Sequence, residues 1–212
     1  MSKFKVMIVD DQSISRHLFE LYVNSSDKYE LAFSVPSAAV ADVYILKNRV
    51  DLILMDILMN DGSNGLETAE KIKKMYPDIK IIAVTSMPES SWMKKAREIG
   101  ADSFWYKETD ENTILEVMDR TMAGESVYPD NAPKVKIGLA NSSEFTDREL
   151  QVLRIITTGA SNSDVAQMLG ISEYTVKAHV RSMLEKTGYR SRTELAIKAR
   201  VIGIAVSHEK LQ

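Results

Sequence analysis

The sequence contains no cysteine, which excludes disulfide bonds and thiolate-bound metal sites and suits a reducing compartment. It also lacks any apolar run near the roughly 18 consecutive residues that span a bilayer. The first residues, Met1 to Lys5, do not begin a secretory signal, and no internal repeat or low-complexity tract is present. Together these absences predict a cytoplasmic protein without a membrane partner.

The composition is that of an ordinary soluble globular protein, with 44% hydrophobic and 27% charged residues, and 212 residues allow one large domain or two small ones. The net charge of −3 hides a difference between the ends. Residues 1–124 carry 15 Lys+Arg and 20 Asp+Glu, whereas residues 144–212 carry 10 and 8. A mildly basic end favours a polyanionic partner, because phosphate neutralisation drives such binding. Ordinary scatter of surface charge explains the difference equally well.

Strand and helix patterns alternate through residues 1–124, which we expect to form one domain. The central strand-like runs are apolar throughout, as in strands covered by helices on both faces. The alternation predicts an α/β fold with a doubly wound parallel sheet. The expected strands are 4–9, 29–34, 50–55, 80–85 and 103–106, and the expected helices are 13–25, 38–48, 65–75, 90–99 and 110–123.

Residues 125–143 lose this rhythm and contain prolines, glycines and small polar residues, which is typical of a linker. The pattern over 144–212 is helical only and predicts a small all-α domain of four helices. Thr146 with Glu149, and Ser191 with Glu194, have the spacing of capping boxes that open a helix. Ser172 is the expected N-cap of the third helix, which we expect to end at Gly188.

Polar residues follow four of the expected strands at the point where each strand ends. The carboxyl ends of parallel strands share one edge of a sheet, so these side chains should meet in one pocket. Its three carboxylates favour a bound Mg²⁺, and the central Asp56 is the candidate nucleophile for phosphoryl transfer. Each residue alone is more often a turn former, a helix cap or a solvated charge, and only their joint occurrence carries the hypothesis. The set is Asp10, Asp11, Asp56, Thr85 and Lys107.

In this arrangement, residues 1–124 resemble the flavodoxin-like (βα)5 receiver domain of bacterial two-component response regulators. The resemblance implies that Asp56 is the phosphoacceptor, that Asp10, Asp11 and Asp56 hold Mg²⁺, and that Thr85 and Lys107 contact the phosphoryl group. It further implies that the Leu58 backbone carbonyl is a metal ligand and that Phe104 is an aromatic switch residue. Strand alternation places Phe104 opposite Lys107, toward the fourth helix, although a plain core aromatic is an equally good interpretation.

Two departures from the receiver pattern concern the loops around the pocket. The loop from Asp56 to Gly65 is one residue longer than usual and lacks a proline, and Glu108 stands where many relatives have a cis proline. We expect the longer loop to alter the rate of phosphorylation or dephosphorylation. An alternative hypothesis is a DNA-binding regulator with an atypical receiver that works without phosphorylation.

Residues 144–206 resemble the four-helix, helix-turn-helix domain of the NarL/FixJ or LuxR type, from Phe145-Thr-Asp-Arg-Glu149 to Thr175-Val-Lys-Ala-His-Val180 and Leu184. Helical spacing places Val176, Val180, Met183 and Leu184 in the core. The opposite side of that helix then faces outward, and its N-terminal half reads bases in such motifs. The expected base-reading residues are Lys177, Ala178 and Arg181, and the expected phosphate-contacting residues are Ser172, Thr175, His179, Arg190 and Arg192.

The leading hypothesis is a phosphorylation-controlled transcription regulator. A sensor histidine kinase would donate phosphate to Asp56, and a homodimer joined through the last helix would bind inverted-repeat DNA. An enzyme such as an aspartyl phosphatase is the contrasting hypothesis. It would require a general acid two residues after the nucleophile, where Leu58 stands, and the histidines at 17, 179 and 208 are scattered. We therefore expect no separate enzymatic activity beyond hydrolysis of the protein's own phosphate.

Overall fold

The computed structural model describes residues 3–59, 61–88, 90–107 and 113–202. Glu108, the start of the helix expected over 110–123, and His208 lie outside the described residues. The chain divides into two compact units, with the main boundary between Asp130 and Asn131, and the short segment Ser86–Ser91 is grouped with the second unit. Among the described residues, no helix is both long and apolar enough to cross a membrane.

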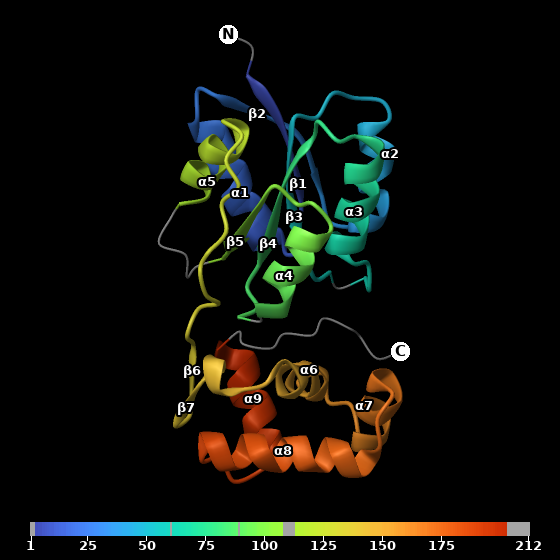
Figure 1. Ribbon diagram of the computed structural model, residues 1–212, viewed down its shortest axis with the longest axis vertical. Helices are drawn as coiled ribbons and strands as arrows, with labels where there is room; N and C mark the ends of the chain where they lie inside the picture. Colours follow the sequence, from blue (N-terminus) through green and yellow to red (C-terminus); the bar gives the residue numbers. More distant parts are fainter. Residues whose placement is uncertain (1–2, 60, 89, 108–112, 203–212) are drawn as a thin grey trace. The chain divides into compact units, whose positions relative to one another are not determined.

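The first unit contains a parallel sheet of five strands in the order β2-β1-β3-β4-β5, with each strand close to its expected position (Figure 1). The doubly wound parallel fold predicted from the alternation is therefore confirmed. Because the strands are parallel, their carboxyl ends lie at one edge. The strands are β1 (Phe4–Val9), β2 (Tyr29–Val35), β3 (Leu52–Asp56), β4 (Lys80–Thr85) and β5 (Ser103–Tyr106).

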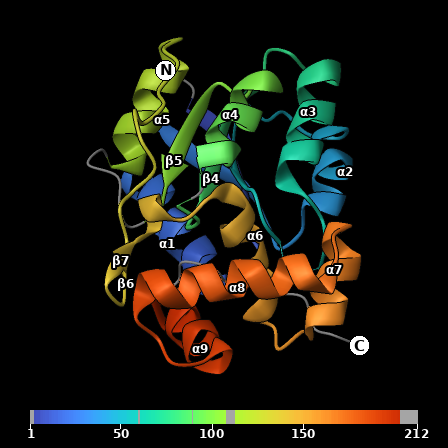
Figure 2. The ribbon, with the colours of Figure 1, turned by 60° about the horizontal axis from the view of Figure 1, so that its bottom comes forward.

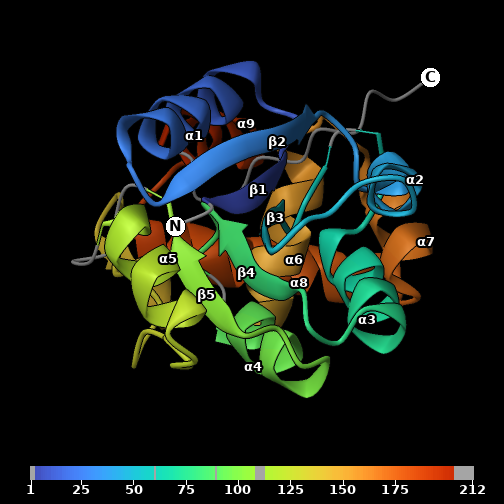
Figure 3. The same cartoon turned by 90° about the horizontal axis from the view of Figure 1, so that it is seen from above.

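Helices cover both faces of this sheet. Seen from above, α1 (Ser13–Ser25) and α5 (Ile114–Met122) lie on one face, and α2 (Ala41–Ile45), α3 (Gly65–Met75) and α4 (Ser90–Glu98) on the other (Figure 3). The helix expected over 38–48 is shorter than predicted and begins as a 3₁₀ turn, Ala38–Val40. It ends early because Asn48 turns back, with its side-chain amide donating to the Tyr44 carbonyl.

Alternate residues of each central strand pack into two separate hydrophobic cores, one on each face of the sheet. Met7 and Val9 of β1 pack on the side of α2 and α3, whereas Val6 and Ile8 pack on the side of α1 and α5. All four side chains are fully buried, and β3 divides its residues in the same way. This arrangement explains why the central strands read as continuous apolar runs.

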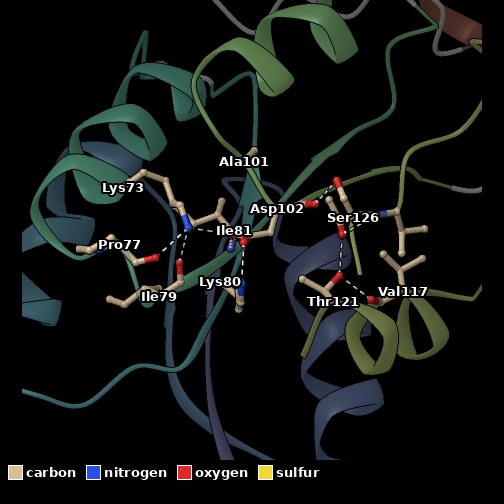
Figure 4. Close-up of polar contacts among 12 residues, drawn as sticks. Lys73, Pro77, Ile79, Lys80, Ile81, Ala101, Asp102, Val117, Thr121 and Ser126 are labelled. Carbon is tan, nitrogen blue, oxygen red and sulfur yellow. Dashed lines mark hydrogen bonds and ion pairs between the residues drawn. The ribbon is translucent and has the colours of Figure 1, made fainter. Parts of the chain in front are cut away.

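A polar cluster ties the amino ends of β4 and β5, at the opposite end of the sheet from the expected pocket (Figure 4). Asp102 accepts hydrogen bonds from Lys73 Nζ, Lys80 Nζ and the Ile81 backbone N–H, each at 2.9 Å. Its backbone carbonyl accepts a hydrogen bond from Ser126 Oγ at 2.9 Å. The segment after α5 is therefore attached to the sheet through β5.

The second unit begins with a small hairpin, β6 (Lys136–Ile137) and β7 (Ala140–Asn141), which the sequence did not predict. Gly138 turns the hairpin at a φ of +61° and packs so closely that a Cβ there would lie 2.2 Å from the Thr187 carbonyl oxygen. Ile137 and Ala140 are buried in the core of this unit, whereas Val127 is buried in the first unit. Thus residues within 125–143 contribute to both cores.

Four helices follow the hairpin and its short 3₁₀ turn (Ser142–Glu144): α6 (Asp147–Ile156), α7 (Asn162–Leu169), α8 (Glu173–Thr187) and α9 (Arg192–Ile202). In this unit the long α8 packs against α6, α7 and α9 (Figure 2). The capping box of Thr146 and Glu149 and the N-cap at Ser172 are confirmed. At the start of α9, Ser191 Oγ accepts from the Glu194 N–H, but the Glu194 carboxylate accepts from the Arg190 N–H instead of that of Ser191.

Candidate functional site

The expected pocket forms at the end of the sheet where the carboxyl ends of the strands lie. Asp10 follows β1, Asp56 ends β3, Thr85 ends β4 and Lys107 follows β5. All four residues are buried, and Asp11 is half-buried beside them. Carboxylate oxygens of Asp10, Asp11 and Asp56 all lie within 4.8 Å of one another, which brings the three acidic residues into one cluster.

Lys107 joins two of these carboxylates. Its Nζ donates to Asp10 Oδ2 at 2.7 Å and to Asp56 Oδ2 at 2.8 Å. The Lys107 backbone N–H also donates to the Thr85 carbonyl at 2.8 Å, which fixes the chain after β5 against the end of β4. A single ammonium group therefore bridges the first and third strands from the end of the fifth.

The buried charges shift the pKa values of the pocket. Burial raises the pKa of Asp56 to about 7, and the negative charge of Asp10 adds to this effect, while Lys107 opposes it. Burial by itself would lower the pKa of Lys107, but the adjacent carboxylates outweigh it and hold that pKa above its usual value. Lys107 is therefore positively charged, and the carboxylate cluster retains an excess of negative charge that a divalent cation would neutralise.

Two residues of α1 support the acidic pair and were not singled out from the sequence. Ser15 Oγ donates to Asp10 Oδ2 at 2.5 Å, and Arg16 Nη1 donates to the Asp10 and Asp11 carbonyls at 2.8 and 3.2 Å. The Gln12 N–H donates to Asp10 Oδ1 at 2.9 Å. The sequence signal for these residues is their position in the turn and first helical turn after the acidic pair.

The loop after Asp56 folds back toward the expected phosphoacceptor. Leu58, the expected carbonyl ligand, is half-buried and forms an antiparallel bridge with Asn64, which caps α3 through its side chain. The Gly65 N–H donates to the Ile57 carbonyl at 3.0 Å. The loop is also attached to the segment that follows β2, because Ser37 Oγ donates to an Asp61 carboxylate oxygen.

Phe104, the expected switch residue, is fully buried in β5. Its ring makes an edge contact with Tyr106, at 4.9 Å between centroids, and a stacked contact with Tyr128, at 6.0 Å. Tyr128 belongs to the segment after α5, so the environment of Phe104 includes a residue far beyond its own strand. No pattern in the sequence indicates this pairing.

The exposed side of α8 carries the expected reading residues. Lys177, Ala178 and Arg181 are exposed, whereas Val176, Val180 and Met183 are buried and Leu184 is half-buried. Tyr174 was not singled out from the sequence, yet it is 83% exposed and precedes Lys177 by three residues. Helical spacing of i, i+3, i+4 and i+7 would have found it. The reading stripe, defined as Tyr174, Lys177, Ala178 and Arg181, thus follows one side of α8.

The expected phosphate-contacting residues differ in their surroundings. Ser172 Oγ accepts from the Thr175 N–H at 3.0 Å, and the two hydroxyls lie 2.8 Å apart, so both residues serve the helix N-terminus. His179 is half-buried and Arg190 is exposed. Arg192 Nη2 donates to the Ala160 carbonyl, which connects α9 to the turn before α7.

Two family models match the chain, the response regulator receiver domain over residues 6–119 and the bacterial regulatory proteins of the luxR family over residues 143–199. The chain belongs to the response regulators. Its combination of a receiver and a LuxR-type domain makes this response regulator a DNA-binding regulator of transcription, as the sequence predicted.

Relatives and solved structures agree with this assignment. The response regulator is 33% identical over 200 residues to the Response regulator protein VraR of Staphylococcus epidermidis, covering 92% of this chain and 95% of the relative. It is 31% identical over 199 residues to the Nitrate/nitrite response regulator protein homolog of Haemophilus influenzae, with the same coverage. The RcsB response regulator of Salmonella typhimurium shares the fold, with a TM-score of 0.57 at 15% identity over 95% of this chain and 100% of that one.

Proposed function

We propose that phosphorylation of Asp56 by a sensor histidine kinase controls dimerisation and DNA binding by this response regulator. The observation that carries the proposal is the geometry of Lys107, whose ammonium group contacts two carboxylates of the three-carboxylate cluster. An acidic cluster that retains negative charge next to a fixed cation suits the binding of a metal ion and then of a phosphoryl group.

The donor set fits Mg²⁺, a hard cation that prefers carboxylate and carbonyl oxygens. Asp10, Asp11 and Asp56 would hold it, together with the backbone carbonyl of Leu58. When bound, the ion neutralises charge on the carboxylates and on the phosphoryl oxygens. Ser15 and Arg16 hold Asp10 and the chain around it in position for this role.

In the transfer step, an Asp56 carboxylate oxygen attacks the phosphorus atom of the kinase phosphohistidine. The phosphorus–nitrogen bond breaks, the imidazole leaves with the electron pair, and an aspartyl phosphate forms. Lys107 exchanges its contact with Asp56 Oδ2 for a phosphoryl oxygen, and the Thr85 hydroxyl donates to another. Attack by water on the same phosphorus releases inorganic phosphate and restores Asp56.

The reading stripe of α8 is the part of the second domain that we expect to enter the major groove. Lys177 and Arg181 lie one turn apart and offer donors to guanine O6 and N7, while the small Ala178 permits close approach. Ser172, Thr175, His179, Arg190 and Arg192 remain the candidates for phosphate contact. The structural neighbour RcsB has been solved in a complex with DNA, with a TM-score of 0.56 at 15% identity, which supports the docking of this fold on a duplex.

The last helix supports pairing of two copies. Leu195 and Ala199 of α9 are buried, whereas Ile197 and Val201, one turn apart, are 57% and 79% exposed. Pairing of this face with the same face of a second copy would remove apolar surface from water. A symmetric pair would match an inverted-repeat operator.

The test is DNA affinity measured before and after treatment with acetyl phosphate and Mg²⁺, on selected inverted-repeat sites. We expect tighter binding after treatment, and loss of both labelling and tightening in Asp56→Asn. Asp27→Asn, which alters an exposed carboxylate, is the matched control and should respond like the wild type. Equal affinity before and after treatment of a labelled wild-type protein would reject the proposed function.

A further inference from the structure

The outer edge of β5 is covered by the chain that follows α5. The Phe104 N–H donates to the Val127 carbonyl at 2.8 Å, and the Val127 N–H donates to Ser103 Oγ at 3.1 Å. Ser126 Oγ donates to the Asp102 carbonyl, a contact visible in Figure 4. An edge strand otherwise presents unpaired backbone groups, and residues 126–128 supply partners for β5. We call these three residues the docking segment.

Side chains of the docking segment pack on both faces of the sheet at β5. Val127 is buried in the core shared with α1 and α5, whereas Tyr128 stacks on Phe104 on the other face. The Arg97 guanidinium of α4 lies 4.1 Å from the centroid of the Tyr128 ring. The Tyr128 hydroxyl donates to the Ala101 carbonyl at 2.8 Å. The ring is therefore held by a stack, a cation and a hydrogen bond.

We propose that Tyr128 is a positioning residue that couples the placement of Phe104 to the docking segment, and so to the connection that leads to the DNA-binding unit. This inference rests on the proposed function, in which the Thr85 hydroxyl donates to the phosphoryl group of Asp56, and it adds that Phe104 shifts together with Thr85. Phe104 is fully buried, so its ring cannot move without repacking of the ring stacked on it. The first unit ends at Asp130, two residues after Tyr128, so the docking segment lies where the connection to the second unit begins.

The register of the sheet relates Thr85 to Phe104. Thr85 pairs with Tyr106 and Ala83 with Phe104, and paired residues of parallel strands point to the same face. Tyr106, the partner of Thr85, therefore lies on the same face as Phe104, and the two rings are in contact at 4.9 Å between centroids. When Thr85 moves to the phosphoryl group, Phe104 follows, its stack with Tyr128 is lost, and the docking segment leaves β5. The docked segment is thus the resting state.

The first test uses Tyr128→Ala. Aromatic stacking of this kind corresponds to about a two- to tenfold change in an equilibrium constant. We expect the unphosphorylated variant to bind DNA more tightly than the wild type by about this factor. The increase in DNA affinity on phosphorylation should be smaller by the same factor. Labelling of Asp56 by acetyl phosphate should stay normal. Tyr128→Phe retains the ring and should keep most of the wild-type response.

The matched control is Tyr44→Ala. Tyr44 stands in a ring pair with Phe33, at 5.0 Å between centroids, at the opposite edge of the same sheet. Its loss should cost stability without changing the gain on phosphorylation. Equal behaviour of Tyr128→Ala and Tyr44→Ala would mean that Tyr128 has a structural role only, and this result would overturn the coupling.

The second test uses the wild-type chain and does not depend on folding of a variant. Hydrogen exchange of the Phe104 amide, which donates to Val127, is measured with and without acetyl phosphate and Mg²⁺. We expect faster exchange at Phe104 and over residues 126–128 after phosphorylation. Unchanged exchange in a labelled protein whose DNA affinity rises would overturn the coupling and leave the proposed function intact. A labelled protein without any rise in DNA affinity would reject the proposed function itself.

Discussion

Gly65 packs so closely against Asp56 that a Cβ at position 65 would lie 1.8 Å from the Asp56 carbonyl oxygen. The obstacle is backbone, which cannot rotate away as a flexible side chain can. The first helical residue of α3 thereby fixes the backbone that carries the candidate phosphoacceptor. Glycine at this position is required by space.

Gly65→Ala should therefore impair phosphorylation. The added methyl group must displace the Asp56 backbone, and a displacement of about 1 Å at a reacting group lowers a rate by up to about a hundredfold. We expect the rate of labelling by acetyl phosphate to fall at least tenfold, with a loss of roughly 1–3 kcal/mol in the free energy of unfolding from overpacking. Glu67→Ala, at an exposed position of the same helix, should label normally. Normal labelling of Gly65→Ala would contradict the geometry.

Glu149 predicts how the second domain responds to acid. Its carboxylate accepts from Lys186 Nζ and Ser182 Oγ at 2.6 Å each, and from the Thr146 N–H at 2.7 Å. Burial works to raise the pKa of Glu149, but these contacts outweigh it and hold the pKa below its usual value. The stabilisation is therefore present above the unfolded pKa of about 4.3 and is lost as the pH falls through the folded pKa.

Glu149→Gln should remove this stabilisation at neutral pH, because the ammonium group of the half-buried Lys186 loses its carboxylate partner. We expect a loss of about 3 kcal/mol at pH 7 in urea denaturation. The difference in the free energy of unfolding between this variant and the wild type should become smaller below pH 4. Glu185→Gln, an exposed position on the same helix as Lys186, should show neither effect. A difference that is independent of pH would contradict the charge-based explanation.

Tyr174 should contribute to DNA recognition from the first turn of α8. Its ring is 83% exposed in the free protein and lies on the reading stripe, so a duplex docked there would bury it. We expect Tyr174→Ala to weaken specific binding by about three- to tenfold, as loss of one apolar base contact does, without changing the slope of affinity against salt. Arg190→Ala should instead weaken binding to all sequences and reduce the salt slope by about 1. A Tyr174→Ala variant with unaltered affinity would remove this residue from the interface.

The exposed side of α1 is a candidate contact surface for a sensor kinase. Ile14, Leu18 and Leu21 are 86%, 45% and 54% exposed at i, i+4 and i+7, and Ser15 and Arg16 of the same helix contact the acidic pair. A kinase that brings its phosphohistidine to Asp56 would cover this stripe. We expect Ile14→Glu to slow phosphotransfer from the kinase at least tenfold, while labelling by acetyl phosphate stays normal. Val43→Glu, at an exposed apolar position of α2, is the control.

The elements of the first domain were predictable because their patterns follow local rules. Each central strand is apolar on both faces, and the polar residue after it identifies its carboxyl end. The parallel arrangement then brings Asp10, Asp56 and Lys107 together, so the candidate pocket followed from the polar residues at the carboxyl ends of parallel strands. The caps at Thr146 and Ser172 were equally local, since a side chain and a backbone N–H three residues away form them.

Two of the features that the sequence did not predict, the Tyr128 contact and the hairpin, depend on contacts between distant segments. Tyr128 meets Phe104 only because the chain after α5 returns to β5, and no periodicity in residues 125–143 signals this return. The hairpin at Gly138 forms against Thr187, nearly fifty residues away. The helix expected over 38–48 ends early because the Asn48 side chain donates a hydrogen bond to the Tyr44 carbonyl. This is a local contact that the apolar pattern alone did not indicate. Tyr174 was missed although helical spacing would have included it.

Lys107 has a consequence for the life of the protein before any signal arrives. Its ammonium group acts as a built-in counter-ion for Asp10 and Asp56, so the acidic cluster is partly neutralised by the chain itself. We therefore expect the receiver to fold without bound Mg²⁺. On the proposed function, phosphorylation then exchanges one ionic partner of Lys107 for another in a pocket that is already assembled.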